Sequence, residues 1–140
     1  MEKIVFIKPK PVKNHITNYK NLIVWRRAYQ LVLDLYPLIE KLPESETNNI
    51  ADQIRRAVTS LPLNIAEGAS SGFRKVFYNH LTYAYGSAKE LDVLLMLLRD
   101  LKYIDTDTYK KRNYDLELFR KQVYKLMLIL EKELEREKGR

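Results

Sequence analysis

The feature that most constrains this chain is the three- and four-residue spacing of its apolar side chains, because such spacing places them on one face of an α-helix. The spacing holds over four segments, which are 21–39, about 48–68, 73–103 and about 108–138. Strict alternation of apolar and polar residues, which is typical of strands, occurs only in a short patch near the N-terminus. Because the connections are short, the predicted fold class is all-α, an antiparallel up-down-up-down four-helix bundle.

Proline and glycine mark the breaks in this pattern. Pro37 lies in the last part of the first predicted helix, where we expect a kink or an early end. Pro62 lies inside the second helix and deprives the Val58 carbonyl of its usual donor, so we expect a bend there. The segment Gly68–Gly72 supplies residues that tolerate a left-handed helix end, and Ile104–Thr108 supplies a break with Asp and Thr caps.

The basic excess is concentrated at the N-terminus. The 140 residues carry a net charge of +7, of which residues 1–20 contribute +4 through five lysines and one glutamate. Residues 1–18 join the apolar patch Ile4–Ile7 to a Lys-Pro-Lys-Pro stretch that cannot be helical. We therefore expect a flexible basic arm at 1–18 and one bundle domain at 19–138.

Composition excludes several classes of protein. The absence of cysteine excludes disulfides, thiolate metal sites and cysteine nucleophiles, and it makes a reducing, cytoplasmic location the default. The longest apolar run, Val93–Leu98, is far shorter than the roughly 20 residues of a membrane span. We expect a soluble protein with no export signal and no membrane partner.

Catalytic groups are scarce. The two histidines, His15 and His80, have no partner at metal-ligand spacing, and we expect His80 to lie at a surface or packing boundary. No glycine-rich loop precedes a helix with a lysine, so no nucleotide cofactor is expected. The sequence predicts no catalytic residues, no metal and no cofactor, and it favours a binding or scaffolding role over an enzyme.

The stretch from Gln53 to Gly68 is the densest in unusual residues. Asn64 and Glu67 follow Pro62 by less than two turns, and we expect them to bond freed backbone groups or each other across a helix contact, a structural role rather than a ligand site. Gly86 costs its helix roughly 1 kcal/mol relative to Ala, which a close helix crossing would justify. We therefore predict that 62–67 packs against 86–90. The residues of this structural motif are Gln53, Pro62, Asn64, Glu67, Gly68, Gly86, Ser87 and Glu90.

Four stretches carry a resemblance to a known family. They are Asn21–Ala28 (NLIVWRRA), Gln53–Ala57 (QIRRA), Leu63–Gly68 (LNIAEG) and Gly86–Leu91 (GSAKEL). In this order and at this spacing they resemble the landmarks of the four-helix-bundle proteins encoded in 23S ribosomal RNA intervening sequences, over about residues 19–135. The resemblance implies an antiparallel four-helix bundle that assembles into a homopentameric ring, with a poorly defined molecular function.

A related branch is the accessory variability protein of diversity-generating retroelements. A resemblance to that branch implies a basic ring that binds a reverse transcriptase and its nucleic acid. The segments Leu35–Ser45 and Leu91–Tyr103 are somewhat similar to the proteins of that branch. The intact string Asn64–Gly68 favours the intervening-sequence branch instead.

Aromatic residues on the predicted helices indicate self-association. There are too many for one bundle interior, and tyrosine and tryptophan are enriched at interfaces. We expect a homo-oligomer rather than a monomer with a tyrosine-rich surface. The residues in question are Trp25, Tyr29, Tyr36, Tyr78, Tyr83, Tyr85, Tyr114 and Tyr124.

Paired basic residues provide the candidate sites for RNA or single-stranded DNA. In an oligomer, symmetry would repeat such pairs on neighbouring helices into a belt that attracts phosphates without reading bases. The opposing hypothesis is a protein-only adaptor in which Ile4–Ile7 adds an edge strand to a partner. The predicted nucleic-acid-binding residues are Arg26, Arg27, Arg55, Arg56, Arg74, Lys75, Lys110, Lys111 and Arg112.

Overall fold

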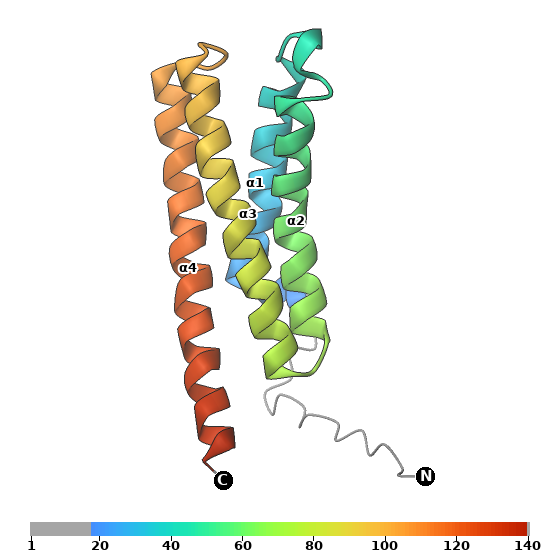
Figure 1. Cartoon of the computed structure of the whole chain (residues 1–140), viewed down its shortest axis with the longest axis vertical. Helices are drawn as coiled ribbons and strands as arrows, with labels where there is room; N and C mark the ends of the chain where they lie inside the picture. The colour runs from blue at the N-terminus through green and yellow to red at the C-terminus, as the bar shows by residue number, and fades with distance from the viewer. Residues whose placement is uncertain (1–17, 140) are drawn as a thin grey trace, which may run out of the picture.

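Four long helices make up the described part of the chain. The computed structural model describes residues 18–139. The helices are α1 (Ile23–Glu40), α2 (Ile50–Ser70), α3 (Arg74–Asp100) and α4 (Thr106–Lys138), with short 3-10 turns at Tyr19–Asn21 and Glu44–Glu46. Successive helices run in opposite directions (Figure 1), which confirms the predicted all-α, up-down-up-down bundle. Apart from Asn18, the predicted arm lies outside the described residues.

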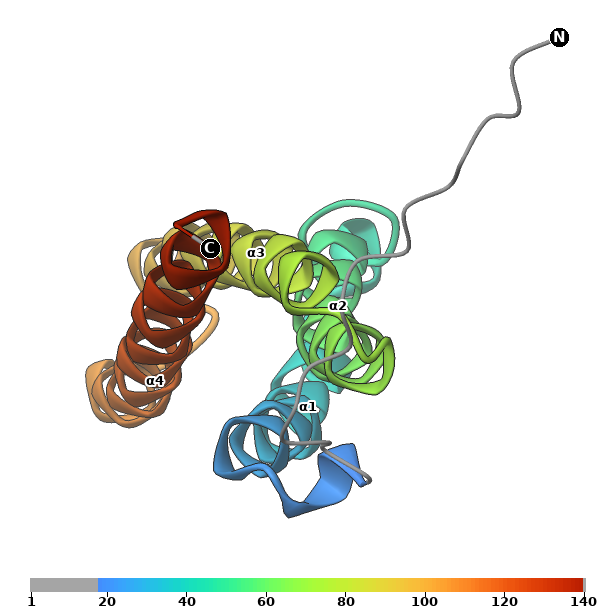
Figure 2. The same cartoon turned by 90° about the horizontal axis from the view of Figure 1, so that it is seen from below.

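The helices surround one apolar core. Each helix packs against its two neighbours, and the pairs α1 with α3 and α2 with α4 lie across the bundle from one another (Figure 2). The contact between α2 and α3 is the most extensive, and that between α1 and α4 is the least. Residues 18–139 contain no buried polar or charged residue. The largest fully buried side chains include Phe119, Leu35, Ile54, Leu61, Ile65, Leu81, Leu91 and Leu95.

Both prolines are accommodated inside helices. α1 continues past Pro37 to Glu40, so the expected early end is wrong. A proline in the last turn removes only one intrahelical hydrogen bond, and the burial of Leu35 and Ile39 on the core face holds that turn in place. α2 likewise continues through Pro62 to Ser70, with Leu61 and Ile65 fully buried on either side of it.

The connections have the expected end signals. Gly72 has φ of 78°, the left-handed conformation that only glycine adopts without strain. Asp105 caps α4, since its side chain accepts a hydrogen bond from the Thr108 amide at 2.7 Å. The Tyr103 hydroxyl donates to Glu46 at 3.2 Å and so joins the α3–α4 turn to the α1–α2 turn at the same end of the bundle. None of the four helices has the length and apolar character needed to cross a membrane.

Candidate functional site

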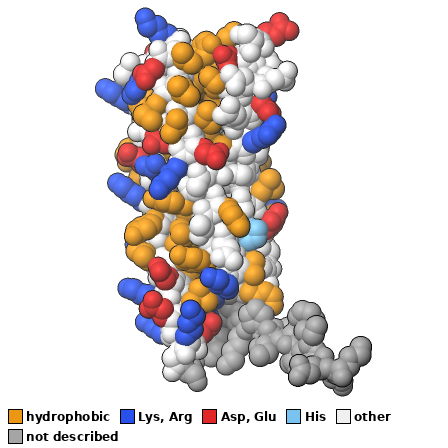
Figure 3. Space-filling view, viewed as in Figure 1, with side chains coloured by type: hydrophobic (Ala, Val, Ile, Leu, Met, Phe, Trp, Pro, Cys, Tyr) orange, Lys and Arg blue, Asp and Glu red, His pale blue; other side chains and the backbone are white. Residues whose placement is uncertain are grey.

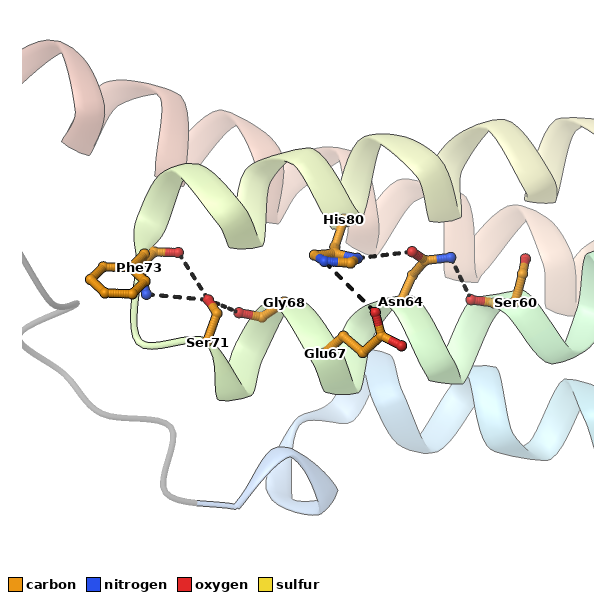
Figure 4. A network of polar contacts seen from close by, with 7 residues as sticks. All are labelled: Ser60, Asn64, Glu67, Gly68, Ser71, Phe73 and His80. Carbon is orange, nitrogen blue, oxygen red and sulfur yellow. Dashed lines mark hydrogen bonds and ion pairs between the residues drawn. The ribbon is translucent and has the colours of Figure 1, made fainter. Parts of the chain in front are cut away.

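The candidate motif on α2 centres on a hydrogen bond to α3. Asn64 Nδ2 donates to the carbonyl of Ser60 at 2.9 Å, so its Oδ1 is the atom that meets His80 Nδ1, also at 2.9 Å (Figure 4). Because Oδ1 only accepts, His80 Nδ1 carries the proton in this bond. Asn64 therefore bonds a backbone group and bridges a helix contact, as expected. The backbone group is the Ser60 carbonyl, and the partner across the contact is half-buried His80 rather than Glu67, which agrees with the packing boundary expected for His80.

Glu67 takes little part in this network. Its side chain is 67% exposed, and its Oε2 lies 3.9 Å from His80 Nε2, beyond hydrogen-bond distance. On the turn that follows α2, the Ser71 hydroxyl donates to the Gly68 carbonyl at 2.7 Å and accepts from the Phe73 amide at 3.2 Å (Figure 4). The motif is thus a helix-joining contact with one exposed carboxylate beside it.

The close approach of α2 to α3 occurs at Gly68, not at Gly86. A Cβ added at Gly68 would lie 2.8 Å from the His80 Cβ and 3.1 Å from the Phe77 Cα. A Cβ added at Gly86 would meet no atom within 4 Å among the described residues. The predicted crossing at Gly86 is therefore wrong, because Gly86 lies on the outer face of α3 while Ala84 and Ala88 face the core.

The register of the two helices corrects a second expectation. Since Asn64 lies opposite His80, the segment 62–67 packs near 77–84 rather than 86–90. Glu90 is exposed and Ser87 half-buried on α3. Gln53, near the start of α2, is exposed and bonds Asn49 within its own turn at 3.3 Å.

The predicted basic pairs lie near the starts of the four helices. Arg26 and Arg27 are on α1, Arg55 and Arg56 on α2, Arg74 and Lys75 on α3, and 110–112 on α4. Because successive helices are antiparallel, the pairs on neighbouring helices lie at opposite ends of the bundle. Basic pairs at the same end of the bundle lie on helices that face each other across it. A single chain therefore does not form a continuous belt of basic residues for phosphates.

Some of these cations are engaged within the chain. Arg74 pairs with Glu133 at 2.7 Å and with Glu137, both on α4. Arg112 pairs with Asp34 of α1 at 2.8 Å and with Asp115 at 3.2 Å. Arg74 and Arg112 are each only 16% exposed, so they hold helices together rather than face a ligand.

Other predicted nucleic-acid-binding residues are more accessible to a ligand than Arg74 and Arg112. Arg56 is 80% exposed despite its pairing with Asp52 at 2.7 Å. Arg26 and Arg55 donate to the carbonyls of Lys20 and Thr47. Lys75 lies over the Tyr78 ring, 5.6 Å from its centroid. The exposed members without an ion-pair partner in residues 18–139 include Arg27, Lys110 and Lys111.

The surface in Figure 3 combines charge with large apolar side chains. Lys and Arg side chains lie mainly along the α4 edge of this face, and hydrophobic side chains gather over α3 near the α3–α4 turn. Of the eight aromatic residues expected to be partly outward, none is fully buried, and four are the most exposed. These are Tyr29, Tyr83, Tyr114 and Tyr124, between 49% and 65% exposed.

An open hollow of about 610 Å³ beside the α3–α4 turn is lined by charged residues, of which Arg99 and Asp100 bind one another. The Arg99 guanidinium bonds Asp100 at 2.8 Å, which raises the pKa of Arg99 and lowers the pKa of Asp100. Hydrogen bonds from Thr108 lower the pKa of Asp105. The pKa of Tyr103 is raised by burial and by nearby Glu46. These groups cap and join helix ends, and in this hollow they do not form a nucleophile with a base.

A second hollow, between α3 and α4, was missed at the sequence level. It encloses about 260 Å³ and is lined by Tyr85, Glu117, Arg120, Lys121 and Tyr124. Its signal in the sequence is helical spacing, since Glu117, Lys121 and Tyr124 recur at four and three residues along α4. In residues 18–139 no group of three or more His, Asp or Glu side chains is placed to hold a metal ion.

Comparison with known proteins identifies the family of this four-helix bundle. Residues 20–125 match the model of the 23S rRNA-intervening sequence protein family. The chain belongs to that family. A crystal structure of a protein of unknown function from the S23 ribosomal protein family of Bacteroides thetaiotaomicron is similar, with a TM-score of 0.69 and 26% identity over 75% of this chain and 98% of that one. No curated protein matches this chain.

Proposed function

We propose that this intervening-sequence protein is a non-enzymatic homo-oligomer, a ring of five copies, that binds RNA as a scaffold or accessory factor. Exposed basic side chains without carboxylate partners in residues 18–139, such as Arg27, Lys110 and Lys111, are the observation that carries the RNA part. Such side chains bind phosphates without regard to base identity. The family resemblance supports the ring of five copies.

Exposed apolar side chains support self-association. Twelve large hydrophobic residues in 18–139 are between 39% and 65% exposed. Three of them, Val93, Leu97 and Leu101, follow each other at four-residue steps along the outer face of α3 and its C-cap residue, Leu101. The same face of α3 includes Gly86. A second copy of this chain would remove such a stripe from water. Light scattering on dilute protein tests this, and a monomer mass would overturn the oligomer and the ring with it.

Binding of single-stranded RNA as a function of salt tests the main proposal. Each phosphate contact contributes about 0.7 to the slope of log K against log salt for a single strand. Charge reversal of Lys110 and Lys111 together should reduce that slope by about 1 to 2. The matched control reverses Lys132 and Lys138, which are outside the proposed set. Absence of binding at low salt by the full chain would contradict the RNA proposal.

A shortened chain that begins at Asn18 measures how much residues 1–17 contribute to the salt dependence of RNA binding. A slope that decreases on shortening would assign phosphate contacts to residues 1–17. An unchanged slope would assign them to the helices. Pull-down with Ile4–Ile7 intact or replaced by polar residues then tests the protein-only adaptor, and reverse transcriptase is the specific partner to include.

The non-enzymatic part is tested by a broad hydrolase screen. Glu67 is exposed next to half-buried His80, and Glu90 is exposed on α3. Activity that copurifies with the protein and disappears on substitution of Glu67, Glu90 or His80 would overturn the scaffold assignment.

A further inference from the structure

The hollow between α3 and α4 combines an open aromatic wedge with cations. The Tyr85 and Tyr124 rings have centroids 6.2 Å apart and planes tilted by 40°, so they form a wedge rather than a closed stack. Tyr124 is 52% exposed, and Tyr85 is half-buried. Both tyrosines line the hollow of about 260 Å³. Ring surface that remains exposed in such a wedge, above all that of Tyr124, is suited to a second flat group.

Lysines flank this wedge on both helices. Lys89 of α3 places its Nζ over the Tyr85 ring, 5.0 Å from the centroid, and Lys121 of α4 lines the hollow. Neither lysine has an ion-pair partner among residues 18–139, so each can take an external anion. Arg120, which also lines the hollow, differs because it pairs with Asp92 of α3 at 3.3 Å across the two helices.

Glu117 supplies the one carboxylate of the lining. A carboxylate repels a phosphate placed next to it and accepts hydrogen bonds from N–H groups. The part of the hollow beside Glu117 is therefore suited to an uncharged group that carries N–H donors, while anions are suited to the lysines.

We propose that this hollow is a base-stacking site for single-stranded RNA, in which an unpaired base lies against Tyr85 and Tyr124 and the adjoining phosphates contact Lys89 and Lys121. This proposal rests on the proposed RNA binding, and it assigns that binding to a defined site. Aromatic platforms flanked by cations bind unpaired bases in this way, because every base has a flat π-face. Duplex RNA, whose bases are stacked and paired, cannot use the wedge.

The test compares Tyr124→Ala with two matched variants. Tyr124→Phe keeps the ring, and Tyr114→Ala removes an equally exposed tyrosine, 61% exposed, from the same helix outside the hollow. Fluorescence anisotropy with labelled oligouridine and with a duplex of the same length measures binding by the full chain. Thermal melting and light scattering on the same samples check fold and mass.

Tyr124→Ala should weaken oligouridine binding about 5- to 150-fold with an unchanged salt slope, and it should leave duplex binding unchanged. Tyr124→Phe and Tyr114→Ala should bind within about 2-fold of the parent protein, which is far less than the loss of one stacked base. Lys121→Ala should reduce the slope by about 0.7, which is one phosphate contact.

Other outcomes are distinguishable. If the parent and all variants bind oligouridine equally, RNA binding stands and the stacking site is overturned. If the parent binds no oligouridine at low salt, the proposed function fails and the stacking site with it. If Tyr124→Ala lowers the mass of the assembly instead of its RNA affinity, the wedge is a contact between copies and the stacking assignment is wrong.

Discussion

Gly68 lies in the last turn of α2 and Gly86 in the middle of α3, and the surroundings of these two glycines are opposite. At Gly68 there is no room for a methyl group, because His80 and Phe77 of α3 lie within 3.1 Å of the place where it would be. At Gly86 nothing lies within 4 Å among the described residues. Glycine lowers the helix propensity at both positions, by about 1 kcal/mol in a helix interior such as that around Gly86. At Gly68 the lower helix propensity of glycine is offset by the close packing of α2 on α3. At Gly86 no contact within the described chain offsets it.

Gly68→Ala should have the largest effect in this comparison. The added methyl group would press on the His80 Cβ and the Phe77 backbone, neither of which is the far end of a flexible side chain. We expect a loss of about 1 to 3 kcal/mol in the free energy of unfolding, as is typical of overpacking. Urea denaturation measures it. Stability equal to that of the parent would contradict the close approach of α2 to α3.

Asn64→Ala should come next. It removes the bond to the Ser60 carbonyl and the bond to His80, beside the same close approach. Because the site is half-buried, we expect a loss of about 1 to 1.5 kcal/mol in the free energy of unfolding. A double-mutant cycle with His80→Ala gives the interhelical part. Strictly additive effects would mean that the two side chains do not interact.

Gly86→Ala should have the opposite sign. With open space around the site, the new methyl group meets no obstacle in the chain, and we expect a gain of about 1 kcal/mol in the free energy of unfolding. The same urea series gives the value. Should the variant instead lose stability or oligomeric mass, the outer face of α3 around Gly86 must be in contact with another copy.

Glu67→Ala should have the smallest effect, although Glu67 belongs to the same sequence string as Asn64 and Gly68. Its carboxylate is 67% exposed and too far from His80 to bond it. We expect a change within about 0.5 kcal/mol in either direction. Thermal melting of this variant beside Asn64→Ala is the check, and an equal loss in the two would place Glu67 inside the network.

Much of the fold could be predicted from the sequence because helical spacing is a local property. The spacing of Leu61 and Ile65, or of Leu91, Leu95 and Leu98, directly indicates which side of a helix is buried, and Gly72 and Asp105 mark the helix ends. Of the two alternatives predicted at Pro37, a kink or an early end, the early end is wrong because local rules omit the packing of Leu35 and Ile39, which keeps the last turn helical.

The candidate site was less predictable because it depends on register between helices. Which residue of α3 lies opposite Asn64 is set by the packing of side chains along two helices and by the length of the turn at 71–73. A shift of about two turns separates the predicted partner segment, 86–90, from the observed one. The same limit explains why Arg74 and Arg112 were expected to face a ligand, whereas distant Glu133 and Asp34 engage them.

The ion pairs of Arg74 also affect the local unfolding of the C-terminal part of α4. α4 has 33 residues and α1 has 18, so the C-terminal part of α4 extends beyond the start of α1, and its end also extends beyond the start of α3 (Figure 1). Arg74, the first residue of α3, holds Glu133 and Glu137 there. Amide protons of α4 should therefore exchange with solvent in a graded order, slowly around Phe119 and fastest beyond Glu137, with Arg74 setting the point where protection ends.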